Sequence, residues 1–350
     1  MVGKERNKVF FDNLFGGYKK NDYICNTRTP KPLYNAQIGG RFFTYTTMTE
    51  TYPKKYNSPD DLVALLIQRG LTITDESIAS QYIRNIGYYR LSAYLYPLLD
   101  IPKEKQIFKQ NSCFGKALEL YCFDKKLRLF LFNEIEKIEI SFRSSLANIV
   151  SEETGNIFWI TDSTMFVNSS KFNKTLELID KELKSSREDF IQHFKNKYSN
   201  PYPPAWMLVE ILPLGVVTRI YDNLADNALR KKIAARFLLP VPVFSSWITI
   251  TTLVRNTCCH HSRVWNKENA ITPMLLKKPL CRWISKEISP NRAFYDICIL
   301  KWFVNVISPE NDMKRHLKKL LSDFPSVDVT AMGFPKNWEE EPLWCSALQE

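Results

Sequence analysis

The residues best suited to chemistry lie between Leu253 and Asn266, where the sequence reads LVRNTCCHHSRVWN. This stretch holds two of the four histidines of the chain, together with two arginines and two asparagines. Imidazole changes charge near neutral pH and can transfer protons, whereas guanidinium stays cationic and matches two phosphate oxygens at once. The combination suits chemistry on a phosphodiester.

An apolar run, residues 247–254, precedes these side chains and predicts a helix over residues 244–264. Asn256 and His260 are four residues apart and would share one face of that helix, with Arg255 beside them and long enough to reach the same point. An imidazole, an amide and a guanidinium would then surround one pocket. His261 would point about 100° away from His260, so we expect it to be packed or hydrogen-bonded.

The four adjacent residues Cys258, Cys259, His260 and His261 raise the alternative of a zinc site. Neighbouring helix positions diverge by about 100° and cannot converge on one ion. No C-x-x-C pair occurs among the eight cysteines, which in a chain without a signal peptide indicates reduced thiols. The sequence also contains no Walker loop and no dinucleotide fingerprint, so we expect neither a metal nor a cofactor.

Apolar residues recur every three or four positions over residues 114–150, which predicts a long central helix. Glu139 and Arg143 lie four residues apart beside that apolar stripe, at a spacing that allows an ion pair within the helix. Helix start and stop signals occur at Ser58 and Gly70, and again at Asp75 and Gly87. We therefore expect an all-α fold in which the helix over 114–150 packs against that over 244–264.

The chain has 350 residues and a formal net charge of +11, which favours a polyanionic partner or reflects a generally basic surface. Nothing resembles a signal peptide or a membrane span, so we expect a cytoplasmic protein that does not engage a membrane. Residues 1–47 look like a poorly ordered, irregular extension, residues 48–344 like one helical domain, and residues 345–350 like a tail.

Aromatic residues crowd the segment from Tyr88 to Leu99, which also contains Arg90. Tyr89 and Arg90 could form a platform on which RNA bases stack, and Arg263 could add a phosphate contact. The alternative is that these aromatic residues pack in the core and expose only their hydroxyl groups to solvent. The usual burial of aromatic residues favours this alternative.

The stretch Arg255-Asn256-x-x-x-His260 has the form of the R-x(4 to 6)-H motif of the HEPN ribonuclease superfamily. Its surroundings resemble abortive-infection (Abi) proteins of the AbiD and AbiF type, over roughly Met48 to Trp344. Several landmarks carry this resemblance in order: NIGYYRLSAYLYP (85–97), LYCFDKKLR (120–128) running on to IEISFR (138–143), FIQHF (190–194), PPAWMLVE (203–210), residues 255–266, and MGFPKNW (332–338).

The resemblance implies a HEPN-like helical bundle with additional helices, and a metal-independent endoribonuclease of a phage-defence system. A ribose 2′-hydroxyl would attack the neighbouring phosphate, with His260 transferring the proton, Arg255 stabilising charge and Asn256 positioning the RNA. Glu139 would orient the catalytic groups, with Arg143 and His261 in supporting places. HEPN nucleases commonly pair two such motifs, and this chain offers one, so we expect a homodimer.

Two alternatives remain open from the sequence. The protein could bind RNA without cleaving it, for example by holding a structured small antitoxin RNA with the same arginines and histidines. The residues from Arg255 to Asn266 could instead be a buried polar network that braces helices, in which case removing His260 would cost about 1 to 3 kcal/mol of stability.

Overall fold

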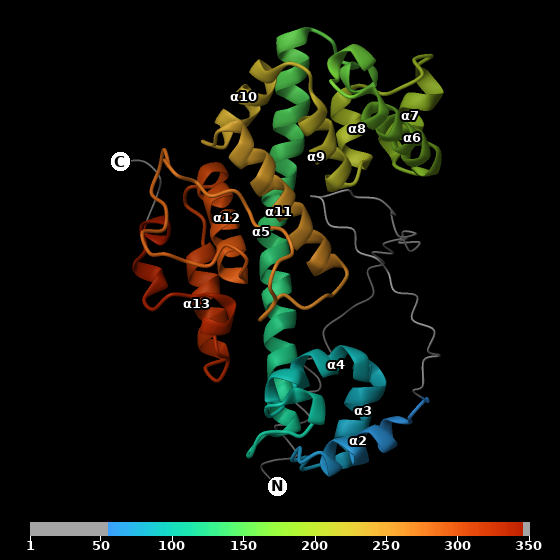
Figure 1. Ribbon diagram of the computed structural model, residues 1–350. Coiled ribbons are helices and arrows are strands. Elements are labelled where there is room, and N and C mark those ends of the chain that lie inside the picture. The colour runs from blue at the N-terminus through green and yellow to red at the C-terminus, as the bar shows by residue number, and fades with distance from the viewer. Residues whose placement is uncertain (1–54, 346–350) are drawn as a thin grey trace, which may run out of the picture. The chain divides into compact units, whose positions relative to one another are not determined.

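The computed structural model describes residues 55–345, so the extension expected over residues 1–47 and residues 346–350 lie outside its described part. Throughout the described residues the regular elements are α-helices and short 3₁₀-helices, and β-pairing is limited to four isolated bridges. Figure 1 shows this helical architecture. The all-α class expected from the sequence is confirmed.

The chain divides into two compact units. Of the described residues, the first unit contains 55–92 and 98–114, and the second contains 93–97 and 115–345. The division falls inside the span 48–344 that we expected to form one domain. The helices of the first unit are α2 (Pro59–Gln68), α3 (Glu76–Ile86) and the larger part of α4 (Tyr88–Leu95), with the 3₁₀-helix η2 (Lys103–Lys105).

Helices α2 and α3 lie where the start and stop signals predicted helices, and they pack against each other. Ser58 and Asp61 form a reciprocal capping box at the start of α2, and the Asp75 carboxylate accepts the Ile78 N–H at 2.9 Å at the start of α3. Gly70 and Gly87 both have a φ of +88°, a left-handed conformation that favours glycine after a helix.

The second unit is built around α5 (Phe114–Thr154), a helix of 41 residues that begins at the boundary between the units. Most of the apolar positions that predicted it are fully buried, among them Phe123, Leu131, Ile138 and Leu146. The other α-helices of this unit are α6 (Ser169–Ser185), α7 (Asp189–Lys197), α8 (Ala205–Ile211), α9 (Leu214–Asn223), α10 (Asn227–Arg236), α11 (Val241–Cys259), α12 (Ala293–Ile307) and α13 (Met313–Asp323).

Helix α11 packs against α9, α10 and α12 and crosses α5 (Figure 1). Phe244 on α11 is fully buried at the centre of this packing. Its ring centroid lies 5.6 Å from that of Phe142 on α5, 5.0 Å from those of Tyr221 and Phe237, and 6.0 Å from that of Phe303. The aromatic core therefore fixes α11, and the residues at its end, against α5.

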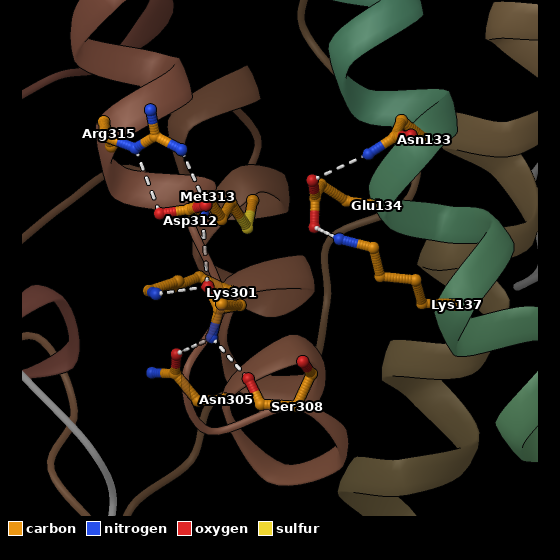
Figure 2. Close-up of polar contacts among 10 residues, drawn as sticks. Asn133, Glu134, Lys137, Lys301, Asn305, Ser308, Asp312, Met313 and Arg315 are labelled. Carbon is orange, nitrogen blue, oxygen red and sulfur yellow. Dashed lines mark hydrogen bonds and ion pairs between the residues drawn. The ribbon is translucent and has the colours of Figure 1, made fainter.

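Glu134 and Lys301 are two of the charged side chains that are buried in the second unit (Figure 2). Glu134 on α5 accepts hydrogen bonds from Asn133 (3.0 Å) and Lys137 (2.9 Å). Lys301 on α12 donates to the side-chain oxygen of Asn311 at 2.8 Å. Burial lowers the pKa of Lys301 to about 8, and the Glu134 carboxylate opposes this shift. Glu134 is therefore paired with the cation of Lys137, whereas the Lys301 ammonium donates to a neutral side-chain amide.

Among the described residues no single helix is long and apolar enough to cross a membrane. Helices α10 and α11 reach that length and apolar character only when taken together, and they are bent by 63° relative to each other.

Candidate active site at the end of helix α11

Helix α11 ends earlier than the sequence predicted. We expected a helix over 244–264, but it ends at Cys259 with His260 as its cap residue. His261 has a φ of +54°, in the left-handed region that terminates helices. Glycine usually marks such a turn, and here a histidine occupies it, so the pattern gave no stop signal.

Two backbone hydrogen bonds close this turn, from His261 N–H to the Cys258 carbonyl at 3.1 Å and from Ser262 N–H to the Thr257 carbonyl at 2.9 Å. These are the paired bonds of a Schellman motif. The side chain of His261 therefore leaves from a turn and not from the helix. The reason we gave for its direction, a continuing helix, was wrong.

Asn256 and His260 keep the relation that the sequence predicted, because the His260 N–H still donates to the Asn256 carbonyl at 2.9 Å. His260 is exposed and Asn256 is half-buried. Within residues 55–345 the His260 imidazole has no hydrogen-bond partner. This imidazole is therefore free to meet a ligand.

Arg255 points toward α5. Its Nε lies 3.6 Å from Oε2 of Glu139, and the Arg255 side chain is 29% exposed. His260 lies five positions after Arg255, which places their directions about 140° apart around the axis of α11. The structure thus brings Arg255 to Glu139, while His260 occupies another side of the helix.

Glu139 also pairs with Arg143, whose Nε donates to Glu139 Oε1 at 3.1 Å. Arg143 is buried and donates in addition to the backbone carbonyls of Leu212 (2.7 Å) and Val209. The predicted ion pair within the helix is therefore present, and Glu139 also faces Arg255. Arg143 anchors the Glu139 carboxylate, which in turn holds the guanidinium of Arg255.

A buried carboxylate that sequence reasoning missed fixes the segment after His261. Asp124 on α5 is fully buried, and its Oδ1 accepts the backbone N–H groups of Val264 (3.1 Å) and Trp265 (2.7 Å). Its Oδ2 accepts the hydroxyl of Tyr94 at 2.6 Å and pairs with Arg128. Burial raises the pKa of Asp124, and the Arg128 guanidinium opposes that shift.

Arg128 lies 3.5 Å from the Ser262 carbonyl, so both members of this ion pair reach the chain that follows the histidines. A signal for the pair existed in the sequence, since Asp124 and Arg128 are four residues apart and each directly follows a core position of the long helix. Their partners in the segment after His261 lie more than 130 residues away in sequence. Only packing of the two segments could identify them.

The three residues proposed to bind RNA differ in their surroundings. Arg263 is half-buried and donates to the Ala93 carbonyl at 2.9 Å, so part of its guanidinium braces the chain near α4. Tyr89 is 93% exposed and Arg90 is also exposed, both in the part of α4 that belongs to the first unit. Tyr94 of the same segment is buried. The aromatic segment therefore supplies both a core residue and an exposed one.

The cysteines beside the histidines do not form a metal site in the described part of the chain, where no three His, Cys, Asp or Glu side chains gather closely enough to hold an ion. Burial raises the pKa of the Cys258 thiol to about 12. A thiol with such a pKa stays protonated and is a poor nucleophile and a poor metal ligand at neutral pH.

A sequence model of the family described as Abi-like protein matches residues 81–266 of the chain. The match begins in α3 and ends just after the Asp124-bound segment, so it contains Glu139, Arg255 and His260. The chain belongs to this Abi-like family. Membership indicates a role in abortive infection, a form of defence against phage. No curated protein and no solved structure matches the chain.

Proposed function

We propose that the protein is an endoribonuclease that acts in abortive infection through Arg255 and His260. The observation that carries the proposal is the end of α11, where an exposed imidazole without a hydrogen-bond partner among residues 55–345 follows an arginine held by a carboxylate. This arrangement supports the interpretation of the sequence motif as one of the HEPN type. It supplies a group for proton transfer and a cation for phosphate on one short segment.

The reaction joins the ribose O2′ to the adjacent phosphorus as the bond from phosphorus to O5′ breaks. The proton of the 2′-hydroxyl must leave and another must reach the departing 5′-oxygen, and His260 is the group that transfers a proton. The products are a 2′,3′-cyclic phosphate and a 5′-hydroxyl. No redox step and no added nucleophile are required.

Arg255 stabilises the negative charge that develops on the phosphoryl oxygens. Its contact with Glu139 is longer than a hydrogen bond, at 3.6 Å, so the guanidinium can turn toward a phosphate without first breaking a short ion pair. Glu139 remains paired with Arg143 while this happens. Asn256, on the same side of α11 as His260, positions the RNA.

Each chain contributes a single such motif, whereas cleavage benefits from both a base for the 2′-hydroxyl and an acid for the 5′-oxygen. We propose that two chains supply these groups in a homodimer, because a two-fold axis would bring the same surface of each chain together. The net charge of +11 supports an RNA substrate.

Non-catalytic RNA binding is the second candidate. The separation of Arg255 and His260 around α11 favours it, because two groups that grip different phosphates need not converge. A structured small RNA, such as an antitoxin transcript, would then be the ligand.

The experiment is to incubate the purified protein with RNA after EDTA treatment and to determine the ends of the products. We expect 2′,3′-cyclic phosphate and 5′-hydroxyl ends that are absent with His260→Ala. Binding without cleavage by the wild-type protein would support the second candidate. Cleavage that disappears on chelation and returns with Mg²⁺ would contradict the proposed chemistry.

A further inference from the structure

Asp296 on α12 is a buried carboxyl group that the proposed reaction does not use. The residue is 5% exposed. Its Oδ2 accepts a hydrogen bond from the side-chain nitrogen of Asn269 at 2.6 Å. Its Oδ1 is buried and has no partner in the described part of the chain. An unpaired carboxylate oxygen of this kind is costly unless a ligand or water meets it.

A small hollow of about 20 Å³ lies against this carboxyl group, between α12 and the C-terminal half of α11. This volume accommodates a group the size of one water molecule. Besides Asp296 its walls include Thr257, Arg263, Lys267 and Asn269. The space therefore has one acceptor without a partner and two cationic side chains.

A larger hollow of about 230 Å³ adjoins it, and the two share Val254, Thr257, Lys267 and Asn269. The aliphatic side chains of Ile250, Leu253 and Ile271 line the remainder together with Glu268 and Ala270. Its volume is below the range of about 300 to 1,000 Å³ that drug-sized ligands occupy, which suits a flat group of a single ring system.

We propose that the two hollows form a nucleobase pocket, in which a base of the RNA lies between the aliphatic walls and directs an exocyclic amino group at Asp296 Oδ1. The inference rests on the RNA-directed function proposed above and assigns that function a base preference. Adenine, cytosine and guanine carry such an amino group. Uracil carries a carbonyl oxygen in its place, and two oxygens would repel each other.

The charges around the pocket fit this ligand. Burial raises the pKa of Asp296 to about 7, and the nearby Lys267 opposes that shift. An N–H donor bound to Oδ1 stabilises the ionised carboxylate and pairs with it more strongly than with a neutral group. Arg263 and Lys267 can contact the phosphate of the same nucleotide. The pocket also shares Thr257 with the last turn of α11, three residues before His260.

The test uses nucleoside 5′-monophosphates, which contain no bond for this reaction to cleave, so binding is measured independently of activity. Two pairs contrast an amino group with an oxo group: cytidine against uridine monophosphate, and adenosine against inosine monophosphate. In the oxo member of each pair the adjacent ring nitrogen also carries a proton. Isothermal titration should show the amino member of at least one pair binding about 10- to 100-fold more tightly, as expected for a hydrogen bond to a charged group.

In Asp296→Asn that preference should fall below about threefold, while binding of the oxo member is retained. Ile271→Trp should weaken binding of both members of a pair, because Ile271 lines the larger hollow and is 48% exposed. Val167→Trp is the control and should leave binding unchanged, because Val167 is 72% exposed and lies outside the hollow. Equal binding within both pairs, a preference that survives Asp296→Asn, or no binding by the folded wild-type protein would overturn the proposal. Loss of RNA cleavage with an intact base preference would instead count against the nuclease function.

Discussion

Asp124 holds the chain that follows His260 and His261 through two backbone N–H groups, and it is buried with Arg128. Asp124→Ala would leave that guanidinium and both N–H groups without their acceptor. Breaking a buried ion pair from one side typically costs about 3 to 5 kcal/mol. We expect a loss of that size in the free energy of unfolding, measured by urea denaturation.

Asp323→Ala is the matched control, since it removes the carboxylate of another i,i+4 pair, with Lys319, in which both side chains are exposed. Exposed pairs contribute little, so this variant should stay close to the wild type. Equal effects of the two substitutions would show that the Asp124 contacts do not hold the segment.

The raised pKa of Asp296 predicts how the free energy of unfolding depends on pH. Its folded pKa of about 7 is raised above the ordinary value of 3.8, so its stabilising contribution is fully present below about pH 4 and is lost as the pH rises through 7. Asp296→Asn carries no titrating group at this position. Its unfolding free energy relative to the wild type should therefore rise by on the order of 2 kcal/mol from pH 5 to pH 8.

Urea denaturation of both proteins at the two pH values measures this difference. A constant offset between them would mean that Asp296 is ionised in the folded protein at pH 5. Asp61, an exposed carboxylate with a lowered pKa, supplies a control through Asp61→Asn, for which any pH dependence should have the opposite sign and lie at more acidic pH.

The turn at the end of α11 depends on the backbone of His261 in the left-handed region. Glycine adopts this conformation readily, whereas a β-branched residue is strained there by about 1 to 2 kcal/mol. His261→Gly should therefore retain the turn and most of the RNA cleavage. His261→Val should lower both the melting temperature and the cleavage rate.

Cleavage by both variants at the wild-type rate would show that the turn does not position His260. Loss of cleavage in the Gly variant with an unchanged melting temperature would assign a chemical role to the His261 side chain.

Helices whose formation depends on residues close together in the sequence could be predicted. The stripe through Phe123, Leu131 and Ile138 predicted α5, and the caps at Ser58 and Asp75 predicted α2 and α3, because periodicity and capping depend on nearby residues. The spacing of Glu139 and Arg143 predicted their ion pair for the same reason.

Contacts between distant segments could not be predicted in this way. The approach of Arg255 to Glu139 and the hold of Asp124 on Val264 exist only after α11 and its following turn pack on α5. The end of α11 was missed because its left-handed residue is a histidine, and the sequence gives no local sign of it. No sequence pattern singled out Asp296, because it lies in α12, an apolar helix that is buried almost throughout.

On the scale of the whole molecule, the proposed dimer predicts that chains share catalytic groups. Mixing wild-type protein with an excess of His260→Ala protein should lower cleavage per wild-type chain as mixed dimers form. Subunit exchange is checked with chains that carry different labels. Unchanged activity with confirmed exchange would mean that each chain cleaves alone.

The central claim, that Arg255 and His260 form one catalytic unit, is tested most directly by the single-turnover rate of RNA cleavage in Arg255→Ala, His260→Ala and the double variant. We predict that each substitution lowers the rate by about 10²- to 10⁴-fold, that the double variant is little slower than the slower single variant, and that RNA affinity changes far less than the rate. Cleavage by folded His260→Ala protein at the wild-type rate would contradict the claim.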